Sequence, residues 1–531
     1  MKEYNVILHA GIDYDGFWSD MESDTDGGKL YIPNRAVQYT NERPASLRQC
    51  WYLLTDEEAE ILRQDERVLG VEIPPEYRTD IQIGLRERQS NTFTKTTSDS
   101  GEFVNWGLIR TLSTDNNYGT STTTTATYDY TVTGRGVDVV IQDSGLQVDH
   151  PEFQDANGNS RVQQINWYTL SGVSGTQNAN HYRDFDGHGT HVAGIAAGKT
   201  YGYAKNARIY SQKLNGLEGA GDSSTGISIT DAFDCIKGWH NNKPIDPITG
   251  AKRPTVVNMS WGYGAGYDTV SEVNYKGTAY TGASIDTTGE RAAFGLLNIV
   301  GDTTAYITNV RIASVDTDVA EMVDAGIHVV IAAGNRSHKI EIYSGSDWSN
   351  FAITDTGTVY YHQGSSPYNS GSIIVGAMDS TAFSSTLDQK ATYSETGPGV
   401  DVFAPGTNIM SCTSTTNGWG AGSQNYYWNA SYRQTNINGT SMAAPQVAGV
   451  VALYLETTPK AKPSAIKSVI TNKAGGAIYS TGLYEDYTSN RSLMTINPKL
   501  LYNPFGSSDK PIQLSGPNLT ISANIIPETR T

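Results

Sequence analysis

The chain has 531 residues, a hydrophobic fraction of 38%, a charged fraction of 18% and a formal net charge of −17. This composition is typical of a globular protein, and the length suits one large catalytic domain with additions or two to three ordinary domains. The acidic balance argues against nucleic acid or an anionic membrane as the main partner, and no apolar run approaches the ~20 residues of a membrane span.

Residues 1–90 are expected to form a small α+β domain of their own. They begin with a strand-like apolar run and continue with a helix in which Thr55 and Glu58 form a capping box. A second strand-like run is stopped by Pro74-Pro75. Residues 91–104 are polar, which indicates a linker, and exposed linkers of this kind are favoured sites of proteolytic processing.

Residues 105–500 alternate short apolar runs with helical patterns, which predicts a doubly wound α/β fold with a parallel sheet and helices on both faces. The expected strands are 136–142, 207–214, 255–260, 326–334 and 372–378. The expected helices are 191–198, 225–239, 316–326 and one that begins at about Ser441. Residues 263–315 and 340–370 are rich in aromatic residues, Gly, Ser and Thr, and are expected to be surface insertions. Residues 501–531 form a C-terminal tail without a motif.

The cysteines do not indicate a disulfide framework, and the N-terminus does not indicate an export signal. Cys50, Cys235 and Cys412 are far apart and odd in number, so they predict no disulfide framework and no metal site. The first residues carry one lysine, offset by Glu3, before a short apolar stretch, which is a poor match to a signal peptide. The expected location therefore stays open between intracellular, virion-associated and secreted.

Four polar residues lie at predicted strand-to-helix junctions: Asp143, His188, Asn335 and Ser441. Taken singly, a turn-forming Asp, a structural His, a turn Asn and an N-cap Ser are the commoner interpretations. Taken together, they are the parts that acyl transfer by a serine requires, namely a nucleophile, a base, a group that orients the base and an oxyanion donor. The expected helix places Ser441 among unpaired N–H donors, with Pro445 in its first turn.

The segments around these residues resemble those of the subtilisin-like serine proteases. "DSGLQVDHPEF", "HGTHVAG" and "NGTSMAAP" are similar to the three active-site segments of that family, in its order Asp, His, Ser. "VVIAAGN" and "DVFAPG" match further family segments, and "NWGLIRTLS" is similar to the mature N-terminus of the proteinase K-like group. The resemblance covers roughly residues 103–475.

The resemblance implies a role for each of the four residues. Ser441 would be the nucleophile, and His188 would take its proton and later give it to the leaving amine. Asp143 would fix the imidazole tautomer and stabilise the imidazolium. The side-chain amide of Asn335 and the backbone N–H of Ser441 would form the oxyanion hole.

The family's substrate-binding segments can also be located by resemblance. Two edge segments that pair with an extended peptide would be Gly219, Ala220 and Gly221, and Ser260, Trp261 and Gly262. The primary pocket would be lined by Ala332, Ala333 and Gly334, and since no charged residue is evident there, we expect a preference for apolar or aromatic side chains. Trp261 replaces the usual small aliphatic residue, and either narrows a pocket or simply packs.

The resemblance extends to maturation, partners and metal. Residues 53–76 are similar to the end of the family's propeptide, so the N-terminal domain is expected to be an intramolecular inhibitor of an enzyme whose substrate is a polypeptide. No cofactor is expected to be required. Calcium is the one metal to consider, because Asp401 matches a carboxylate that binds calcium in proteinase K-like members. An Asp before an apolar turn is equally often structural.

Three functional hypotheses follow. The first is a serine endopeptidase made as an autoprocessed zymogen. The second is an uncleaved or inactive component that uses the subtilase fold for structure or interaction, for example in a viral particle. The third, an esterase on another hydrolase fold, is disfavoured because the G-x-S-x-G elbow is absent at Ser441 and the order of the partners differs.

Overall fold

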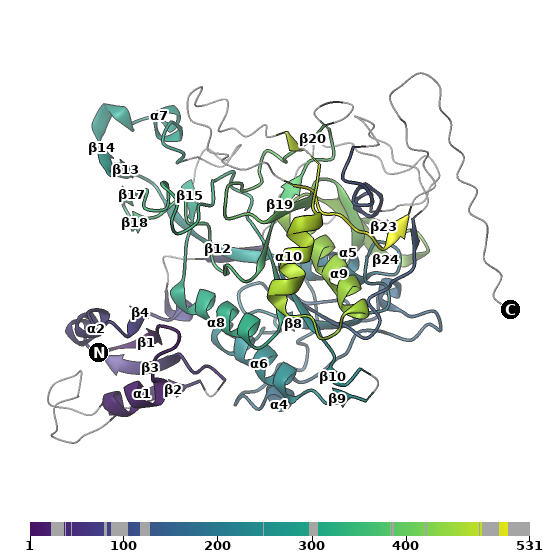
Figure 1. Cartoon of the computed structure of the whole chain (residues 1–531), viewed down its shortest axis with the longest axis horizontal. Coiled ribbons are helices and arrows are strands. Elements are labelled where there is room, and N and C mark those ends of the chain that lie inside the picture. The colour runs from purple at the N-terminus through teal and green to yellow at the C-terminus, as the bar shows by residue number, and fades with distance from the viewer. Residues whose placement is uncertain are drawn as a thin grey trace.

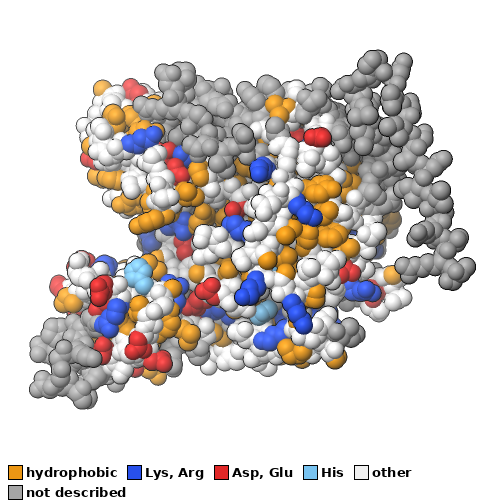
Figure 2. Space-filling view, in the orientation of Figure 1, with side chains coloured by type: hydrophobic (Ala, Val, Ile, Leu, Met, Phe, Trp, Pro, Cys, Tyr) orange, Lys and Arg blue, Asp and Glu red, His pale blue; other side chains and the backbone are white. Residues whose placement is uncertain are grey.

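The structure is a computed structural model of the chain. It describes residues 1–22, 37, 39–43, 45–78, 82–85, 105–116, 128–247, 249–296, 306–382, 384, 387–419, 422–476, 478–479 and 499–507. A central α/β body carries two smaller lobes on one side, the first built from the N-terminal residues and the second from β13, β14, β17 and β18 (Figure 1). A notch separates the two lobes on the face that Figure 2 shows.

The central body is built on a six-stranded parallel sheet in the order β21-β19-β16-β11-β7-β8. Its strands are β7 (Asp138–Asp143), β8 (Arg208–Lys213), β11 (Thr255–Met259), β16 (His328–Ala332), β19 (Ile373–Met378) and β21 (Val402–Pro405). Apolar runs buried on both faces are typical of parallel strands, and the five strands predicted from them are confirmed. β21 lies within the "DVFAPG" segment and was not predicted as a strand.

Helices cover both faces of this sheet, as the doubly wound prediction requires. α5 (His188–Ala197) and α9 (Thr440–Thr457) pack against each other and against the sheet, while α6 (Ile229–Asn242) and α8 (Ala313–Asp324) form a second packed pair. Shorter or peripheral helices are α3 (Gly107–Arg110), α4 (Trp167–Ser171) and α10 (Pro463–Lys473). α9 starts at Thr440, so Pro445 lies in the second turn rather than the first. None of the described helices is both long enough and apolar enough to cross a membrane.

The N-terminal lobe has a hydrophobic core of its own, to which Val6, Phe17, Tyr52 and Leu62 contribute. Its four-stranded sheet has the order β2-β3-β1-β4, with β1 (Lys2–Leu8), β2 (Tyr39–Glu42), β3 (Gln49–Leu54) and β4 (Val68–Glu72). α1 (Tyr14–Glu22) and α2 (Asp56–Arg63) complete the lobe, followed by a 3-10 turn at Pro75–Tyr77. α2 begins with the predicted capping box of Thr55 and Glu58. The predicted linker at 91–104 lies outside the described residues.

The two predicted insertions combine into one lobe. β13 (Val270–Tyr275) pairs with β14 (Thr278–Tyr280) from the first insertion and with β17 (Phe351–Thr354) from the second, and β17 pairs with β18 (Gly357–Val359). A separate core that includes Tyr275, Phe294 and Tyr361 lies beneath this sheet. α7 (Thr288–Ala292) and a 3-10 turn at Gly282–Ser284 belong to the same lobe.

A further sheet, with three strands in the order β15-β12-β5, links all three parts of the molecule. β12 (Trp261–Tyr267) leaves the central body directly after β11, and pairs on one side with β15 (Tyr306–Asn309). On its other side it pairs antiparallel with β5 (Gln82–Leu85), which follows the N-terminal lobe in the chain. Residues 82–85 are thus an edge strand on the segment that the sequence assigned to substrate binding.

The remaining elements are short and peripheral to the central sheet. β22 (Ile409–Thr413), β23 (Gln424–Tyr426) and β24 (Asn429–Ile437) form an antiparallel sheet in the order β22-β24-β23 that leads into α9. Three two-stranded pairs are β9 (Ile245–Asp246) with β10 (Ala251–Lys252), β20 (Asp388–Gln389) with β25 (Ile478–Tyr479), and β6 (Asp129–Tyr130) with β26 (Gly506–Ser507). A 3-10 turn occupies Pro151–Phe153. Beyond residue 507, the predicted C-terminal tail lies outside the described residues.

Candidate active site

Asp143 and His188 meet at the carboxyl edge of the sheet. Asp143 is the last residue of β7, and His188 is the first residue of α5. Asp143 Oδ1 lies 2.8 Å from His188 Nδ1, and both side chains are fully buried. A carboxylate at this distance selects the tautomer that carries its proton on Nδ1, so Nε2 is the nitrogen left to accept a proton.

Asp184 holds the turn from which His188 enters its helix. Its Oδ1 accepts from Gly187 N at 2.7 Å, and its Oδ2 accepts from Thr190 N at 2.9 Å. Gly187 has a φ of 93°, a left-handed conformation that suits glycine. Ser144 adds a tie to the neighbouring turn, because its Oγ donates to Asp184 Oδ1 at 3.0 Å. These contacts fix the start of α5 relative to the end of β7.

Ser441 is the second residue of α9, and its carbonyl has an unusual partner. Pro445 has no N–H, so the helical bond that would reach the carbonyl of Ser441 cannot form. Ser260, directly after β11, donates from Oγ to this carbonyl at 3.1 Å. In return, Ser441 Oγ donates to the carbonyl of Ser260 at 3.1 Å. The reciprocal pair ties the start of α9 to the sheet edge.

Asn335 is oriented by Thr440, a residue that the sequence analysis did not single out. Asn335 Oδ1 accepts from both the backbone N–H and the Oγ1 of Thr440, each at 2.9 Å. Thr440 Oγ1 in turn accepts from Gly334 N at 3.1 Å. Asn335 Nδ2 is buried and has no hydrogen-bond partner among the described residues. The amide oxygen is thus taken up by Thr440, and the two N–H donors of Asn335 remain available for a further acceptor.

The two segments expected to bind substrate, residues 219–221 and 260–262, lie in different settings. Gly219 has no room for a side chain, because a Cβ there would lie 2.3 Å from Asp186 N. Ser260 borders β12, in which Trp261 is paired with Leu85 and Gly262 with Gly84. Residues 82–85 thus occupy this edge in the way an extended peptide would. Gly219 itself is buried, and Ala220 and Gly221 follow it in an exposed turn.

Trp261 is packed in the interior rather than directed to an open surface. Its side chain is fully buried, with its ring centroid 6.4 Å from that of Phe233 and 5.8 Å from that of Tyr263. Of the two interpretations that the sequence left open, these contacts favour packing. The ring therefore anchors the start of β12 to the interior.

The wall formed by Ala332, Ala333 and Gly334 has charged neighbours that the sequence did not reveal. A Cβ built on Gly334 would lie 3.1 Å from Glu395 Oε1, so this buried carboxylate touches the wall. Glu395 Oε1 accepts from Asn309 Nδ2 at 3.0 Å, and Asn309 Oδ1 accepts from Arg336 at 3.1 Å. Only the fold brings Glu395 here, since it lies about sixty residues further along the chain.

Asp401 does not present a free carboxylate to a metal. Its Oδ2 accepts from Lys467 Nζ at 2.8 Å and from Ile374 N at 2.8 Å. Burial raises the pKa of Asp401, and the Lys467 charge opposes that rise. The described residues contain no group of three or more His, Cys, Asp or Glu side chains that could hold a metal ion. The calcium expected from resemblance does not fit this position, because a side-chain cation already fills it.

A doubly wound parallel sheet with a buried Asp–His pair and a helix-borne serine at one edge defines a serine hydrolase of the subtilisin class. A family model described as "Subtilase family" matches residues 134–502. The chain belongs to the subtilase family, and its enzyme class is that of the subtilisin-like serine endopeptidases, which are hydrolases.

Curated relatives carry names of the same class. An "Extracellular serine proteinase" of Thermus sp. (strain Rt41A) is 27% identical over 431 residues, covering 80% of this chain and 70% of the relative. "Proteinase R" of Parengyodontium album is 28% identical over 400 residues, covering 75% of this chain and 70% of the relative. "Alkaline serine exoprotease A" of Vibrio alginolyticus is 26% identical and covers 82% of this chain, which spans 55% of that relative.

The contacts of Thr440 predict a measurable positioning effect. Thr440→Val removes the hydroxyl that holds Asn335 Oδ1 and keeps the side-chain volume, so we expect kcat on a peptide substrate to fall about 10-fold or more with KM little changed. Thr440→Ser, which keeps the hydroxyl, should restore most of the rate. Equal kcat values for wild type and Thr440→Val would show that the hydroxyl does not position the amide.

Proposed function

We propose that this chain is a serine endopeptidase that hydrolyses peptide bonds through Asp143, His188 and Ser441, and that it is made as a zymogen inhibited by its own N-terminal lobe. The observation that carries the catalytic part is the buried 2.8 Å contact between Asp143 and His188, at the sheet edge where Ser441 lies in the first turn of α9. The partner in the reaction is a polypeptide, as the names of the relatives indicate.

The proposed reaction follows from the groups at this edge. His188 Nε2 takes the proton of Ser441 Oγ as that oxygen attacks the scissile carbonyl. The oxyanion that develops receives hydrogen bonds from Asn335 Nδ2 and from the N–H of Ser441, which as a first-turn donor has no intrahelical acceptor. His188 then protonates the leaving amine, and a water molecule activated by the same imidazole hydrolyses the acyl-enzyme and regenerates Ser441.

The zymogen part is supported first by the position of β5. This strand pairs antiparallel with β12 and ends at Leu85, opposite Trp261, the neighbour of Ser260. Ser260 in turn exchanges hydrogen bonds with Ser441. The N-terminal lobe is therefore followed by a strand that occupies the peptide-binding edge and runs toward the nucleophile. We place the processing site among the residues that follow Leu85 and precede the catalytic domain.

The second support is that carboxylates of the N-terminal lobe cap both helices of the α6–α8 pair. Glu72 Oε1 accepts from Ser314 N, in the first turn of α8, at 2.9 Å. Glu76 Oε1 accepts from Thr230 N, in the first turn of α6, at 2.9 Å. Negative charge at a helix N-terminus satisfies orphan N–H donors and interacts favourably with the helix dipole.

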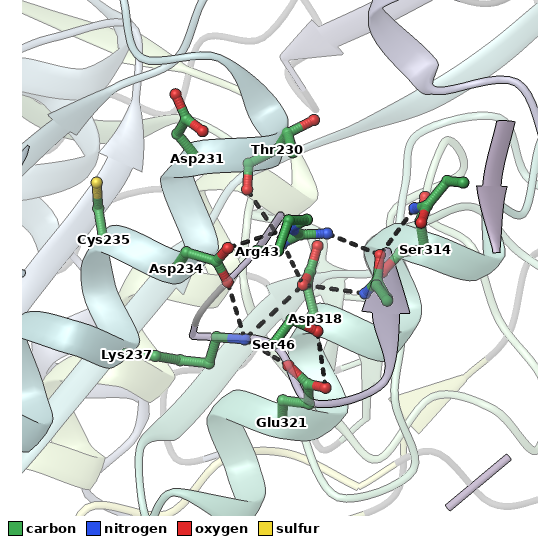
Figure 3. Close-up of polar contacts among 12 residues, drawn as sticks. Arg43, Ser46, Thr230, Asp231, Asp234, Cys235, Lys237, Ser314, Asp318 and Glu321 are labelled. Carbon is green, nitrogen blue, oxygen red and sulfur yellow. Dashed lines mark hydrogen bonds and ion pairs between the residues drawn. The ribbon is translucent and has the colours of Figure 1, made fainter. Parts of the chain in front are cut away.

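A buried ionic cluster completes this interface (Figure 3). Arg43 from the N-terminal lobe donates to Asp234 on α6 at 3.1 Å and to Asp318 on α8 at 2.8 Å, and all three side chains are at most 4% exposed. Lys237 pairs with Asp234 at 3.0 Å and with Glu321. Without Arg43, the carboxylates of Asp234, Asp318 and Glu321 would share the single ammonium group of Lys237. Arg43 adds a second positive charge to this cluster.

The alternative of an uncleaved interaction module makes an opposite prediction about the chain itself. Purified wild type is expected to convert with time into a form whose N-terminus lies between residues 86 and 105, while Ser441→Ala stays at full length. Intact mass and N-terminal sequencing measure the conversion, and an unstructured protein added as substrate reports turnover. If both chains remain intact and neither cuts the added protein, the endopeptidase proposal fails.

The contacts of Arg43 with α6 and α8 predict that this residue anchors the N-terminal lobe. In a Ser441→Ala background, Arg43→Met leaves buried carboxylates without their partner, which typically costs about 3–5 kcal/mol. Amide hydrogen exchange should therefore quicken at the first turns of α6 and α8 and along β4. Lys2→Met is the matched control, because Lys2 pairs with Asp56 at the surface, where water screens the pair and it contributes little to stability. Identical exchange in the two variants would exclude Arg43 as an anchor of the lobe.

A further inference from the structure

The ammonium group of Lys467 lies in a setting normally built for a metal cation. Lys467 is on α10, and its Nζ donates to the carbonyl of Ser370 at 2.8 Å, to the carbonyl of Ser372 at 2.7 Å and to Asp401 Oδ2 at 2.8 Å. An ammonium group has three N–H donors, and here each has an oxygen acceptor. The group is therefore fully coordinated by the protein.

The three oxygens come from rigid parts of the central body. Ser370 and Ser372 immediately precede β19, and Asp401 immediately precedes β21, the neighbouring strand in the sheet. Asp401 is further held by the N–H of Ile374, and its own N–H donates to the carbonyl of Ile374 at 2.9 Å. Two carbonyl oxygens and one carboxylate, fixed by strand pairing, form the kind of oxygen ligand set that Ca²⁺ prefers.

The Lys467 and Asp401 side chains are 21% and 20% exposed, so water can reach the site but the pair is not a loose surface contact. Water access matters because Ca²⁺ takes six to eight oxygen ligands and commonly completes its shell with water. Without the lysine side chain, the pocket would offer protein oxygens on one side and solvent on the other.

We propose that the Lys467 ammonium group takes the place of a Ca²⁺ ion in this chain, tying α10 to the starts of β19 and β21 without any metal. The oxygen cage is retained, and only the cation differs. Removing the lysine side chain should therefore convert the site into one that binds Ca²⁺. This inference concerns the stability of the fold and does not depend on the proposed function.

Two other lysines show that this chain repeatedly uses ammonium groups to satisfy carbonyl clusters. Lys390 Nζ donates to the carbonyls of Ala391 at 2.7 Å and Ser394 at 3.0 Å, and is almost completely buried. Lys205 Nζ donates to the carbonyl of Lys199 at 3.0 Å. Lys467 differs from both because its cage also contains a carboxylate, which gives it a net negative charge and makes it the one of these three suited to a divalent ion.

The test compares four full-length chains, all carrying Ser441→Ala so that none can be shortened by self-cleavage: the parent, Lys467→Ala, Lys462→Ala and Lys467→Ala/Asp401→Asn. Lys462→Ala is the charge-matched control, since Lys462 precedes α10 and is exposed. Thermal unfolding is followed in EDTA and in about 5 mM Ca²⁺, above the ~0.1–1 mM dissociation constants of weak calcium sites. Calorimetric titration with CaCl₂ counts the bound ions.

We expect Lys467→Ala to melt below the parent in EDTA and to regain at least about 2 °C in Ca²⁺, because a ligand that binds only the folded state stabilises it. It should also titrate with one Ca²⁺ site more than the parent. The melting temperatures of the parent, Lys462→Ala and the double variant should change between EDTA and Ca²⁺ by a similar, smaller amount. A Lys467→Ala chain that responds like the parent, that stays unfolded even in Ca²⁺, or that keeps its extra response after Asp401→Asn would overturn the proposal.

Discussion

Parallel strands that share a sheet end at one edge, and the candidate active site depends on this constraint. β7, β11 and β16 are adjacent in the sheet, so Asp143, Ser260 and Asn335 reach the same edge although they are far apart in the chain. His188 and Ser441 then enter from the first turns of α5 and α9, which pack against each other. Because these strands are packed on both faces, a shift of register would disrupt close packing on each face, and this holds the residues at their ends in place.

At Ser441 a residue at the sheet edge compensates for a hydrogen bond that the helix cannot form. A proline inside α9 leaves one helical carbonyl without its normal donor, which would be costly in a buried position. The hydroxyl of Ser260 supplies the missing donor. The carbonyl that accepts from it belongs to Ser441, the candidate nucleophile. The same proline that weakens the helix therefore creates the bond that fixes its first turn to the sheet. Thr440 holds Asn335 through its hydroxyl, while the carbonyl of Ser260 accepts from Ser441 Oγ, so neighbouring groups orient both the candidate nucleophile and the candidate oxyanion donor.

Local sequence pattern predicted the parts of the molecule that local physics determines. The five strands are short apolar runs, and Asp143, His188, Asn335 and Ser441 each lie in a motif at a strand or helix end. Pairings between distant segments leave no such signal. Nothing periodic in residues 270–275 indicates a partner at 351–354, so the two insertions could not be recognised as one lobe, and the same holds for β5 on β12.

Asp401 shows the same limit at the level of one side chain. Its neighbourhood in the sequence matched a calcium-binding carboxylate, yet the cation that it meets is supplied by a lysine 66 residues away. A lysine on a short helix is normally a solvated side chain, so sequence alone favours that interpretation. Only the packing of α10 against the loop before β19 shows that its ammonium group has three protein acceptors.

The ionic cluster around Arg43 explains how an inhibitory lobe could dock firmly and still leave. Burial raises the pKa of Asp318 in spite of the opposing charges of Arg43 and Lys237, whereas at Asp234 burial is outweighed and the same two charges lower the pKa. Each buried ion pair is thus a balance between attraction and the loss of water around the charges. While the lobe is covalently attached, the helix caps and the β5–β12 pairing position it at no translational cost. Under the proposed zymogen function, cleavage of the chain would remove that advantage, and rehydration of three carboxylates around a single lysine would favour separation.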